Sequence, residues 1–287
     1  MGDIFAMAEG KFGKVVVIEL CHKLVPHSHP EIQFSYWLAG GQCNGRVGEA
    51  SASCSESQAM VINRYQAHDA ELMQAHLPAT LLVIYLNEEW FDQHFSTQFG
   101  PIHFQLGQLT HTPEMRSKSW ELMQKILFVS DRDMASIQED VQALIRLTLD
   151  NNPHLVVPKT NAIRRKMLDY RLRLALTHLS DNMTERDLIN KLSKLVGVSR
   201  SRLYTLFKKE LQSTPKLIRN SILIDAVTHH LALPKVDLSQ LSQKLGFSTS
   251  ANFSRFFRGH KGVTPTTYKK QITTRAQNEF KQHDTTR

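Results

Sequence analysis

Residues 241–265 read LSQKLGFSTSANFSRFFRGHKGVTP, and residues 192–215 read LSKLVGVSRSRLYTLFKKELQSTP. The two stretches match at an offset of 49 residues, which becomes 50 after the turn. The aligned pairs include Leu192 with Leu241, Gly197 with Gly246, Ser199 with Ser248, Leu203 with Phe253, and Phe207 with Phe257. Each copy predicts a short helix, a glycine in a left-handed turn, a serine that can cap the next helix, and a second helix anchored by Leu or Phe. The chain therefore contains two predicted helix-turn-helix units.

The second helix of such a unit packs its apolar face inward and presents its other face to the major groove of DNA. The predicted inward residues are Leu203, Leu206 and Phe207 in the first copy and Phe253, Phe256 and Phe257 in the second. Both outer faces are small, polar and basic. The candidate DNA-binding residues on them are Arg200, Ser201, Arg202, Tyr204, Thr205, Lys208, Lys209, Ser250, Ala251, Asn252, Ser254, Arg255 and Arg258.

Residues 216–233, between the two copies, are rich in apolar side chains and predict one uninterrupted helix. At a rise of 1.5 Å per residue this helix would be about 27 Å long. A spacer of this length could hold two recognition helices about one DNA turn, roughly 34 Å, apart. One chain could then contact two adjacent major grooves.

Charge is divided unevenly along the chain. Residues 1–160 contain 11 Lys and Arg against 18 Asp and Glu, a net charge of −7, whereas residues 161–287 contain 24 against 9, a net charge of +15. A basic excess of this size favours a polyanionic partner for the C-terminal part. The expected partner is double-stranded DNA.

The C-terminal region, over about residues 165–270, resembles the DNA-binding domain of the AraC/XylS family of transcription regulators. The most specific stretch is residues 241–270, LSQKLGFSTSANFSRFFRGHKGVTPTTYKK. The resemblance implies that base readers are found among Ser201, Tyr204, Thr205, Ser250, Ala251, Ser254 and Arg255. The chain departs from the family at Gln212, where Gly is usual, and at Ala251, where Ser is common. The resemblance also implies that the protein is a transcription activator that works with RNA polymerase.

The N-terminal part has a different texture. From Val15 to about Leu86, short apolar runs alternate with Gly, Pro, Asn and Ser, which is typical of an antiparallel β-sandwich or barrel. Apolar residues then recur at helical spacing over 115–129 and 134–149. The predicted fold class is α+β, with a β-barrel and two following helices preceding an all-α domain. The predicted domains are 1–150, a linker at 151–160, the DNA-binding domain at 161–272 and a polar tail at 273–287.

The family resemblance implies that the barrel is cupin-like, and residues 26–41, PHSHPEIQFSYWLAGG, resemble its first motif. His27, His29 and Glu31 alternate, so on a strand they would share one face. His68 falls where a second motif would add another histidine. We expect these four residues to contact a small-molecule effector, and we predict no metal, cofactor or catalytic residue. The two helices resemble the family's dimerisation element, although packing against the barrel explains them equally well.

Two alternatives remain open from the sequence. One is a regulator controlled by a protein partner, which predicts a filled barrel. The other is a metal-dependent cupin enzyme whose basic tail anchors it to nucleic acid, which predicts bound metal and turnover.

Cys21, Cys43 and Cys54 lack the spacing of a disulfide framework or a cysteine zinc site. No stretch has the length of a membrane helix or the pattern of a secretion signal, so we expect a cytoplasmic protein.

Overall fold

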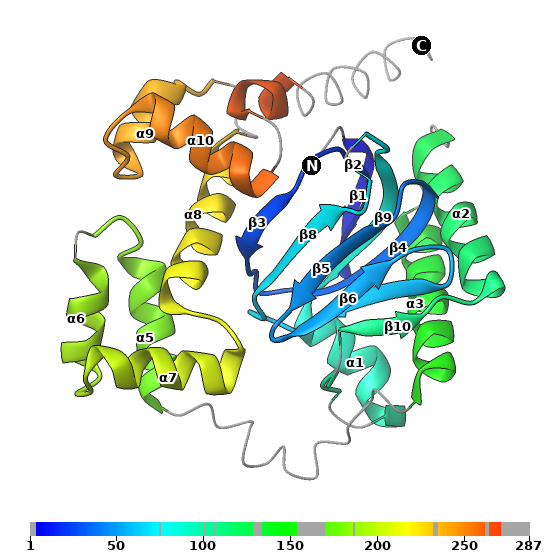
Figure 1. The fold of residues 1–287 in the computed structure, drawn as a ribbon, viewed down its shortest axis with the longest axis horizontal. Helices are drawn as coiled ribbons and strands as arrows, with labels where there is room; N and C mark the ends of the chain where they lie inside the picture. The colour runs from blue at the N-terminus through cyan, green and yellow to red at the C-terminus, as the bar shows by residue number, and fades with distance from the viewer. Residues whose placement is uncertain are drawn as a thin grey trace.

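The computed structural model describes residues 4–74, 76–99, 102–105, 107–128, 134–153, 170–185, 187–231, 235–261 and 264–270. An N-terminal domain of two β-sheets carries helices on one face, and a C-terminal domain consists of helices (Figure 1). The α+β fold class predicted from the sequence is confirmed. The predicted tail at 273–287 and residues 154–160 of the predicted linker lie outside the described residues.

The N-terminal domain is a barrel-like pair of sheets. One sheet has the strand order β1-β2-β9-β4-β7-β10 and the other β3-β8-β5-β6. The strands are β1 (Ile4–Gly10), β2 (Gly13–Leu20), β3 (Leu24–His27), β4 (Ile32–Gly40), β5 (Cys43–Val47), β6 (Ala50–Cys54), β7 (Gln58–Ile62), β8 (His68–Leu72), β9 (Ala79–Leu86) and β10 (Gln108–Thr110). All strand pairs with an assigned register are antiparallel. The sequence pattern foresaw this region from Val15 onward but not β1.

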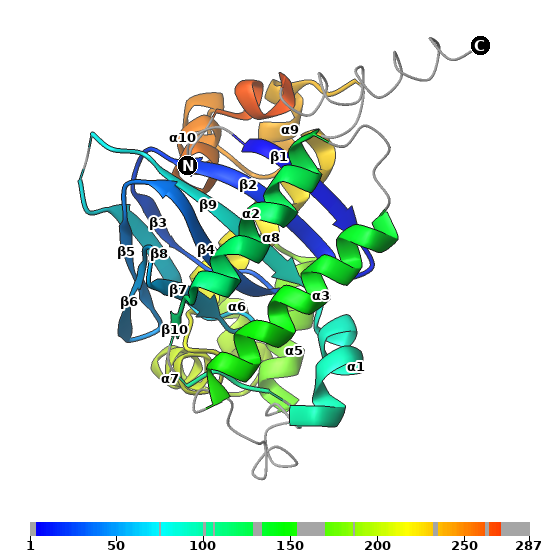
Figure 2. The ribbon, with the colours of Figure 1, turned by 90° about the vertical axis from the view of Figure 1, so that its right-hand side faces the viewer.

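The strand period of two divides the apolar residues between two cores. In β2, Val16 and Ile18 join the cluster inside the barrel, whereas Val15 and Val17 join the cluster under the helices. The covering helices are α1 (Glu88–Phe99), α2 (Pro113–Phe128) and α3 (Met134–Asn151). Figure 2 shows α2 and α3 side by side across the larger sheet. The helix α1 was not predicted, and α3 extends through Asn151, the first residue of the predicted linker.

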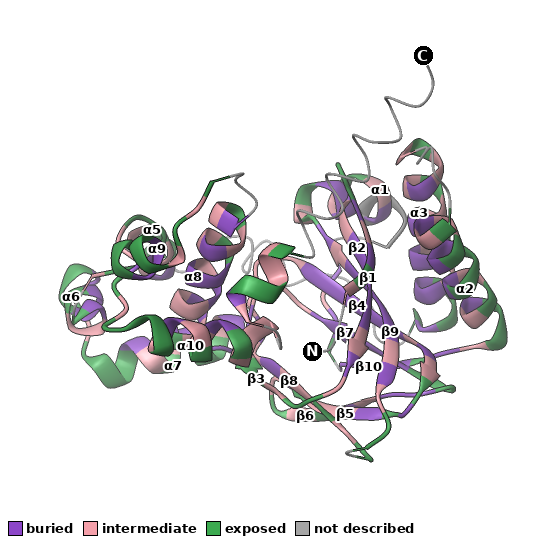
Figure 3. Ribbon diagram, turned by 90° about the horizontal axis from the view of Figure 1, so that it is seen from above, coloured by how far each residue is buried: buried purple, intermediate pink, exposed green. Residues whose placement is uncertain are grey.

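The C-terminal domain contains α5 (Tyr170–Asp181), α6 (Leu188–Leu195), α7 (Arg200–Leu211), α8 (Pro215–Leu231), α9 (Leu238–Lys244) and α10 (Ser250–Lys261). Residues 265–270 form a further helical turn. Its apolar residues form two separate clusters, one for each helix-turn-helix unit, and α8 contributes to both, through Ile218 to the first and Val227 to the second. In Figure 3 the buried stretches of α8 are purple. The long helix α8 therefore joins the two units.

The turns of the two units match the sequence pattern with one exception. Gly197 and Gly246 adopt left-handed φ angles of 67° and 77°. Ser199 caps α7, since its hydroxyl accepts a hydrogen bond from the Arg202 amide. The prediction that Ser248 caps α10 is wrong. The capping residue is Thr249, whose hydroxyl accepts a hydrogen bond from the Asn252 amide at 3.1 Å. The extra residue in the second turn moves the capping position one place along the chain.

Candidate nucleic-acid interface and interdomain cavity

The outer face of α7 is open to solvent. Its exposed candidate residues are Arg200, Ser201, Arg202, Thr205, Lys208 and Lys209, and Tyr204 is half-buried. Leu203 and Phe207 are fully buried on the opposite face, as predicted. The helix begins at the Ser199 cap, and its first turn carries the positive partial charge of a helix N-terminus. These features suit contact with a phosphate backbone and base edges.

The outer face of α10 has the same character. Ser250, Ala251, Arg255 and Arg258 are exposed, whereas Asn252 and Ser254 are half-buried. The Arg255 guanidinium donates a hydrogen bond to the Asn252 side-chain oxygen at 2.6 Å. This exposed bond holds the arginine along the outer face of the helix without burying it. The structure thus brings the predicted residues of each copy onto one face of one helix.

The barrel contacts the first unit directly. Lys208 forms an ion pair with Glu49 of the barrel, with 3.2 Å between Nζ and Oε1. Gln212 follows α7 in a left-handed conformation, with φ of 48°. Its carbonyl oxygen accepts a hydrogen bond from the Ala67 amide at 3.2 Å, and its side chain accepts one from Gln66. The side chain of Gln212, one of the two residues at which the chain departs from the family, therefore forms an interdomain contact.

The barrel also contacts the second unit and the helix that joins the units. Both α8 and α10 lie against β3. The side chain of Val25 in β3 is close to Gly259 of α10. These contacts place the C-terminal end of the second recognition helix beside the opening of the barrel.

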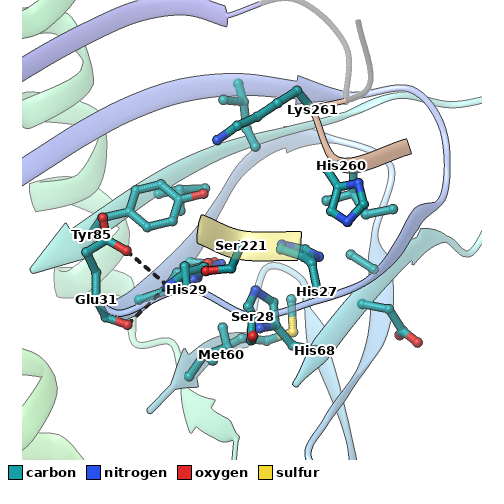
Figure 4. A pocket seen from close by; sticks show the side chains of 18 of the residues that line it. His27, Ser28, His29, Glu31, Met60, His68, Tyr85, Ser221, His260 and Lys261 are labelled. Atoms are coloured by element: carbon teal, nitrogen blue, oxygen red, sulfur yellow. Dashed lines mark hydrogen bonds and ion pairs between the residues drawn. The ribbon is translucent and has the colours of Figure 1, made fainter. Parts of the chain in front are cut away.

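A cavity lies between the two domains and continues into the barrel (Figure 4). About 950 Å³ of atom-free space lies within it, a figure that also counts open solvent at its mouth. Apolar side chains from the barrel strands, such as Ile18, Met60 and Leu81, line its inner part. The polar side chains that line it, most of them toward its mouth, come from both domains: Lys14, His27, Ser28, His29, Glu31, Gln33, Ser35, His68, Asp69, Tyr85, Ser221, Asp225, His260 and Lys261.

Three of the predicted effector contacts form a histidine cluster at this mouth. The ring centroids of His27 and His68 are 4.2 Å apart, and those of His29 and His68 are 4.9 Å apart. The fourth predicted residue, Glu31, lies 3.4 Å from Nδ1 of His29. The four residues are therefore close together, although the geometry differs from the one expected. The strand β3 ends at His27, and His29 and Glu31 lie in the connection to β4.

Burial keeps the rings of His27 and His68 in their neutral form. Burial, followed by repulsion from His29, lowers the pKa of His27 to about 3. Burial and the neighbouring His27 and His29 hold the pKa of His68 well below its ordinary value. For Glu31, burial favours the acid form, but the hydrogen bond with His29 and the charge of Lys14 outweigh it and lower the pKa to about 2. The mouth therefore combines the neutral imidazoles of His27 and His68 with the ionised carboxylate of Glu31.

The sequence pattern missed every cavity residue from the C-terminal domain. Ser221 and Asp225 belong to α8, and His260 and Lys261 end α10. His260 and Lys261 follow the basic face of a recognition helix, so their local pattern indicates DNA contact alone. Their position at the cavity depends on packing against β3, which no local pattern records.

A protein-family model described as a helix-turn-helix domain matches residues 192–271. This range contains both copies of the repeat and the helix that joins them. The C-terminal domain is an AraC-type helix-turn-helix domain. The resemblance to the AraC/XylS family that the sequence indicated is confirmed for this domain.

The curated proteins to which this chain is similar include operon regulatory proteins. The raffinose operon transcriptional regulatory protein RafR of Pediococcus pentosaceus is 27% identical over 99 residues, which cover 34% of this chain and 36% of RafR. The Msm operon regulatory protein of Streptococcus mutans is 22% identical over 161 residues, which cover 54% of this chain and 56% of that protein. The chain thus matches between about a third and just over half of the length of these relatives.

Among solved structures, ToxT from Vibrio cholerae has a similar fold over nearly the whole chain. Its apo form has a TM-score of 0.58 and 11% sequence identity, covering 92% of this chain and 98% of ToxT. Wild-type ToxT with a bound unsaturated fatty acid has a TM-score of 0.56 and covers 96% of this chain. At this identity the likeness concerns the fold alone.

None of the described helices combines the length and apolarity that a membrane span requires.

Proposed function

We propose that this protein is a sequence-specific DNA-binding transcription regulator, and an activator, controlled by a small molecule in the interdomain cavity. The observation that carries the proposal is the repeated unit: two recognition helices in one chain, each with a buried apolar face and an exposed polar, basic face. The net charge of +15 over residues 161–287 supports the same partner.

Within each unit, some residues are proposed to contact base edges and others to contact phosphates. Ser201, Tyr204 and Thr205 of α7 and Ser250, Ala251, Ser254 and Arg255 of α10 read base edges. An arginine can bond guanine O6 and N7 together, and an alanine can contact a thymine methyl group. The remaining members, Arg200, Arg202, Lys208, Lys209, Asn252 and Arg258, bond phosphates and fix the register on the duplex.

The cavity supports control by a small molecule over control by a protein partner. A regulator of the second kind would have a filled barrel, whereas the barrel here opens into a cavity with an apolar interior and a polar mouth. His27, His29, Glu31 and His68 are the proposed effector contacts. ToxT, which shares the fold, has been solved with an unsaturated fatty acid bound. We assign no catalytic role to any residue of the chain.

The proposed assembly is a cytoplasmic homodimer that contacts RNA polymerase. Helices α2 and α3 supply the dimer interface in this proposal. Phe128, at the end of α2, is 78% exposed, and Trp120 on the same helix is 40% exposed. Exposed aromatic side chains on a helix are a common feature of self-association surfaces.

The proposal is tested by selecting genomic DNA fragments with the purified full chain. We expect the selected fragments to share one sequence motif and to bind at least about 1,000-fold more tightly than scrambled duplexes. We also expect the protein to increase transcription from a selected promoter by purified RNA polymerase. The proposal would be contradicted if the protein enriched none of the fragments relative to the input library.

A further inference from the structure

Four buried polar atoms at the cavity have no hydrogen-bond partner among the described residues. They are the hydroxyl oxygens of Ser28 and Ser221 and the Nε2 atoms of His68 and His260. Ser28, His68 and Ser221 are 2%, 6% and 5% exposed. Such atoms are rare in folded proteins because each one loses its bonds to water without replacement. Two come from the barrel and two from the DNA-binding domain, and all four line the same cavity (Figure 4).

The backbone determines what the two histidines can offer. Nδ1 of His68 lies 2.9 Å from the carbonyl oxygen of Gln66, and Nδ1 of His260 lies 2.8 Å from that of Phe256. A carbonyl oxygen only accepts, so Nδ1 must carry the proton in both rings. In a neutral ring Nε2 is then an acceptor. His27 follows the same rule, because its Nδ1 lies 2.9 Å from the Val25 carbonyl oxygen.

The cavity therefore presents hydrogen-bond acceptors that burial prevents from becoming donors. Burial lowers the pKa of His27, His68 and His260 alike. A carboxylate ligand could bond these atoms only if the buried rings first took up a proton, because otherwise two acceptors would face each other. Among the described residues, no three His, Cys, Asp or Glu side chains are placed to hold one metal ion. A ligand with O–H donors fits the acceptors.

The charges at the mouth balance one another. Lys14 pairs with Glu31, with 3.8 Å between Nζ and Oε1, and the mouth also carries Lys261 and Asp225. A third carboxylate of the lining, Asp69, accepts a hydrogen bond from the Arg46 amide at 2.8 Å and interacts with the Lys23 ammonium. The remaining two cations and two carboxylates leave no excess charge for an ionic ligand to neutralise. An ammonium group on the ligand would face Lys261, and a carboxylate on the ligand would face Glu31 and Asp225. An uncharged ligand avoids both costs.

We propose that the cavity binds an uncharged, hydroxyl-bearing small molecule that donates hydrogen bonds to Nε2 of His68 and of His260 and so bridges the barrel to α10. The inference rests on the proposed control by a small molecule and names the ligand class and the residues that couple it to DNA. Ser28 and Ser221 complete the set, since a hydroxyl group can donate or accept.

Such a ligand acts on the second recognition helix by a direct route. His260 lies five residues after Arg255 on α10, so the ligand bonds the same helix that reads DNA. A molecule that contacts both domains stabilises the arrangement in which they touch. Because binding energies are coupled reciprocally, the ligand changes DNA affinity by the same factor by which DNA changes ligand affinity.

The test measures the melting temperature of the full chain with a panel of uncharged monosaccharides and sugar alcohols at millimolar concentration. Sugar acids, amino sugars and octanoate at the same concentration form the comparison set. We expect at least one uncharged compound to raise the melting temperature by about 4 °C or more. We expect the same compound to change the affinity for a selected duplex at least about fivefold.

Variants assign the effect to the two imidazoles. His68→Phe and His260→Phe should abolish the shift, and His260→Gln, which keeps an acceptor near the Nε2 position, should restore part of it. His230→Phe is the matched control, because its Nδ1 also lies near a carbonyl oxygen four residues earlier, at 2.7 Å, but it does not line the cavity. Ser221→Ala, a smaller change, should weaken the shift even if a phenylalanine variant unfolds.

The inference is overturned if no uncharged compound raises the melting temperature, if only charged compounds do, or if the shift persists in both phenylalanine variants. Affinity for selected DNA without ligand is measured in parallel for the wild-type chain. A chain whose melting temperature responds to the ligand as expected but which binds no selected DNA would contradict the proposed function alone. A chain that binds DNA selectively but lacks the ligand effects would contradict this inference alone.

Discussion

Truncation of Phe257 tests whether the second recognition helix is anchored as the structure shows. Its side chain is fully buried in the second apolar cluster of the C-terminal domain. Its ring centroid lies 5.4 Å from that of Tyr268 and 6.4 Å from that of Phe253. Replacing a buried Phe by Ala costs about 3–5 kcal/mol. A domain of about 100 residues is stable by only about 5–15 kcal/mol, so Phe257→Ala should remove a large part of its stability.

The expected change is large enough to follow by thermal unfolding. Each kcal/mol lowers the melting temperature of a domain of this size by about 4–8 °C, which predicts a shift of at least about 12 °C. The three tryptophans, Trp37, Trp90 and Trp120, all belong to the N-terminal domain. Their fluorescence therefore follows the unfolding of the barrel, whereas circular dichroism at 222 nm also follows the C-terminal helices.

We expect Phe257→Ala to lower the dichroism transition far more than the fluorescence transition and to abolish DNA binding. The control in the same domain is Leu195→Ala, since Leu195 is 45% exposed and its truncation should cost less than about 1 kcal/mol. Equal melting curves for the two variants would refute the placement of the apolar face of α10.

Three further predictions concern reading, pH and assembly. Arg255→Ala should reduce the binding free energy for a selected duplex by about 1–3 kcal/mol and that for scrambled DNA by much less. Lys208→Ala should instead weaken binding to both duplexes alike and lower the slope of log affinity against log salt concentration by about one. Equal losses of affinity for both duplexes in Arg255→Ala would exclude base reading by this residue. Because burial lowers the pKa of His27 to about 3, only the unfolded chain takes up this proton below about pH 6.5. The free energy of unfolding should therefore fall as the pH drops from 6.5 toward 3, and less steeply in His27→Gln; parallel profiles would disprove this. Phe128→Glu should convert a dimer to a monomer in sedimentation experiments, and an unchanged mass would exclude this part of α2 from the interface.

The helix-turn-helix units could be predicted because local residues determine them. Gly197 and Gly246 supply the left-handed turns, and Ser199 supplies a cap, within a few residues of the helices that they limit. The cap of α10 was placed at Ser248 instead of Thr249, because the inserted residue could not be positioned from the repeat alone. The helix α1 was missed, although Trp90, Phe91 and Phe95 are buried in it.

The cavity could be predicted only in part, because four of its polar residues, Ser221, Asp225, His260 and Lys261, come from the C-terminal domain and are distant in the sequence from the barrel. The alternation of His27, His29 and Glu31 suggested one strand, but Pro30 has no amide to continue the hydrogen-bond ladder. The carbonyl oxygen of His29 instead accepts a hydrogen bond from the Tyr65 amide at 2.7 Å. The cluster still forms, since this loop brings His29 beside His68. Nothing local to His260 indicates that α10 packs against β3.

The central claim is that both recognition helices of one chain read adjacent major grooves, and a footprint at single-base resolution on a selected duplex tests it most directly. We predict two protected segments on one face of the duplex, about one helical turn of 10–10.5 base pairs apart. Thr205→Ala should weaken protection of one segment, and Arg255→Ala that of the other. A single protected segment, or two segments that both variants weaken equally, would contradict the account.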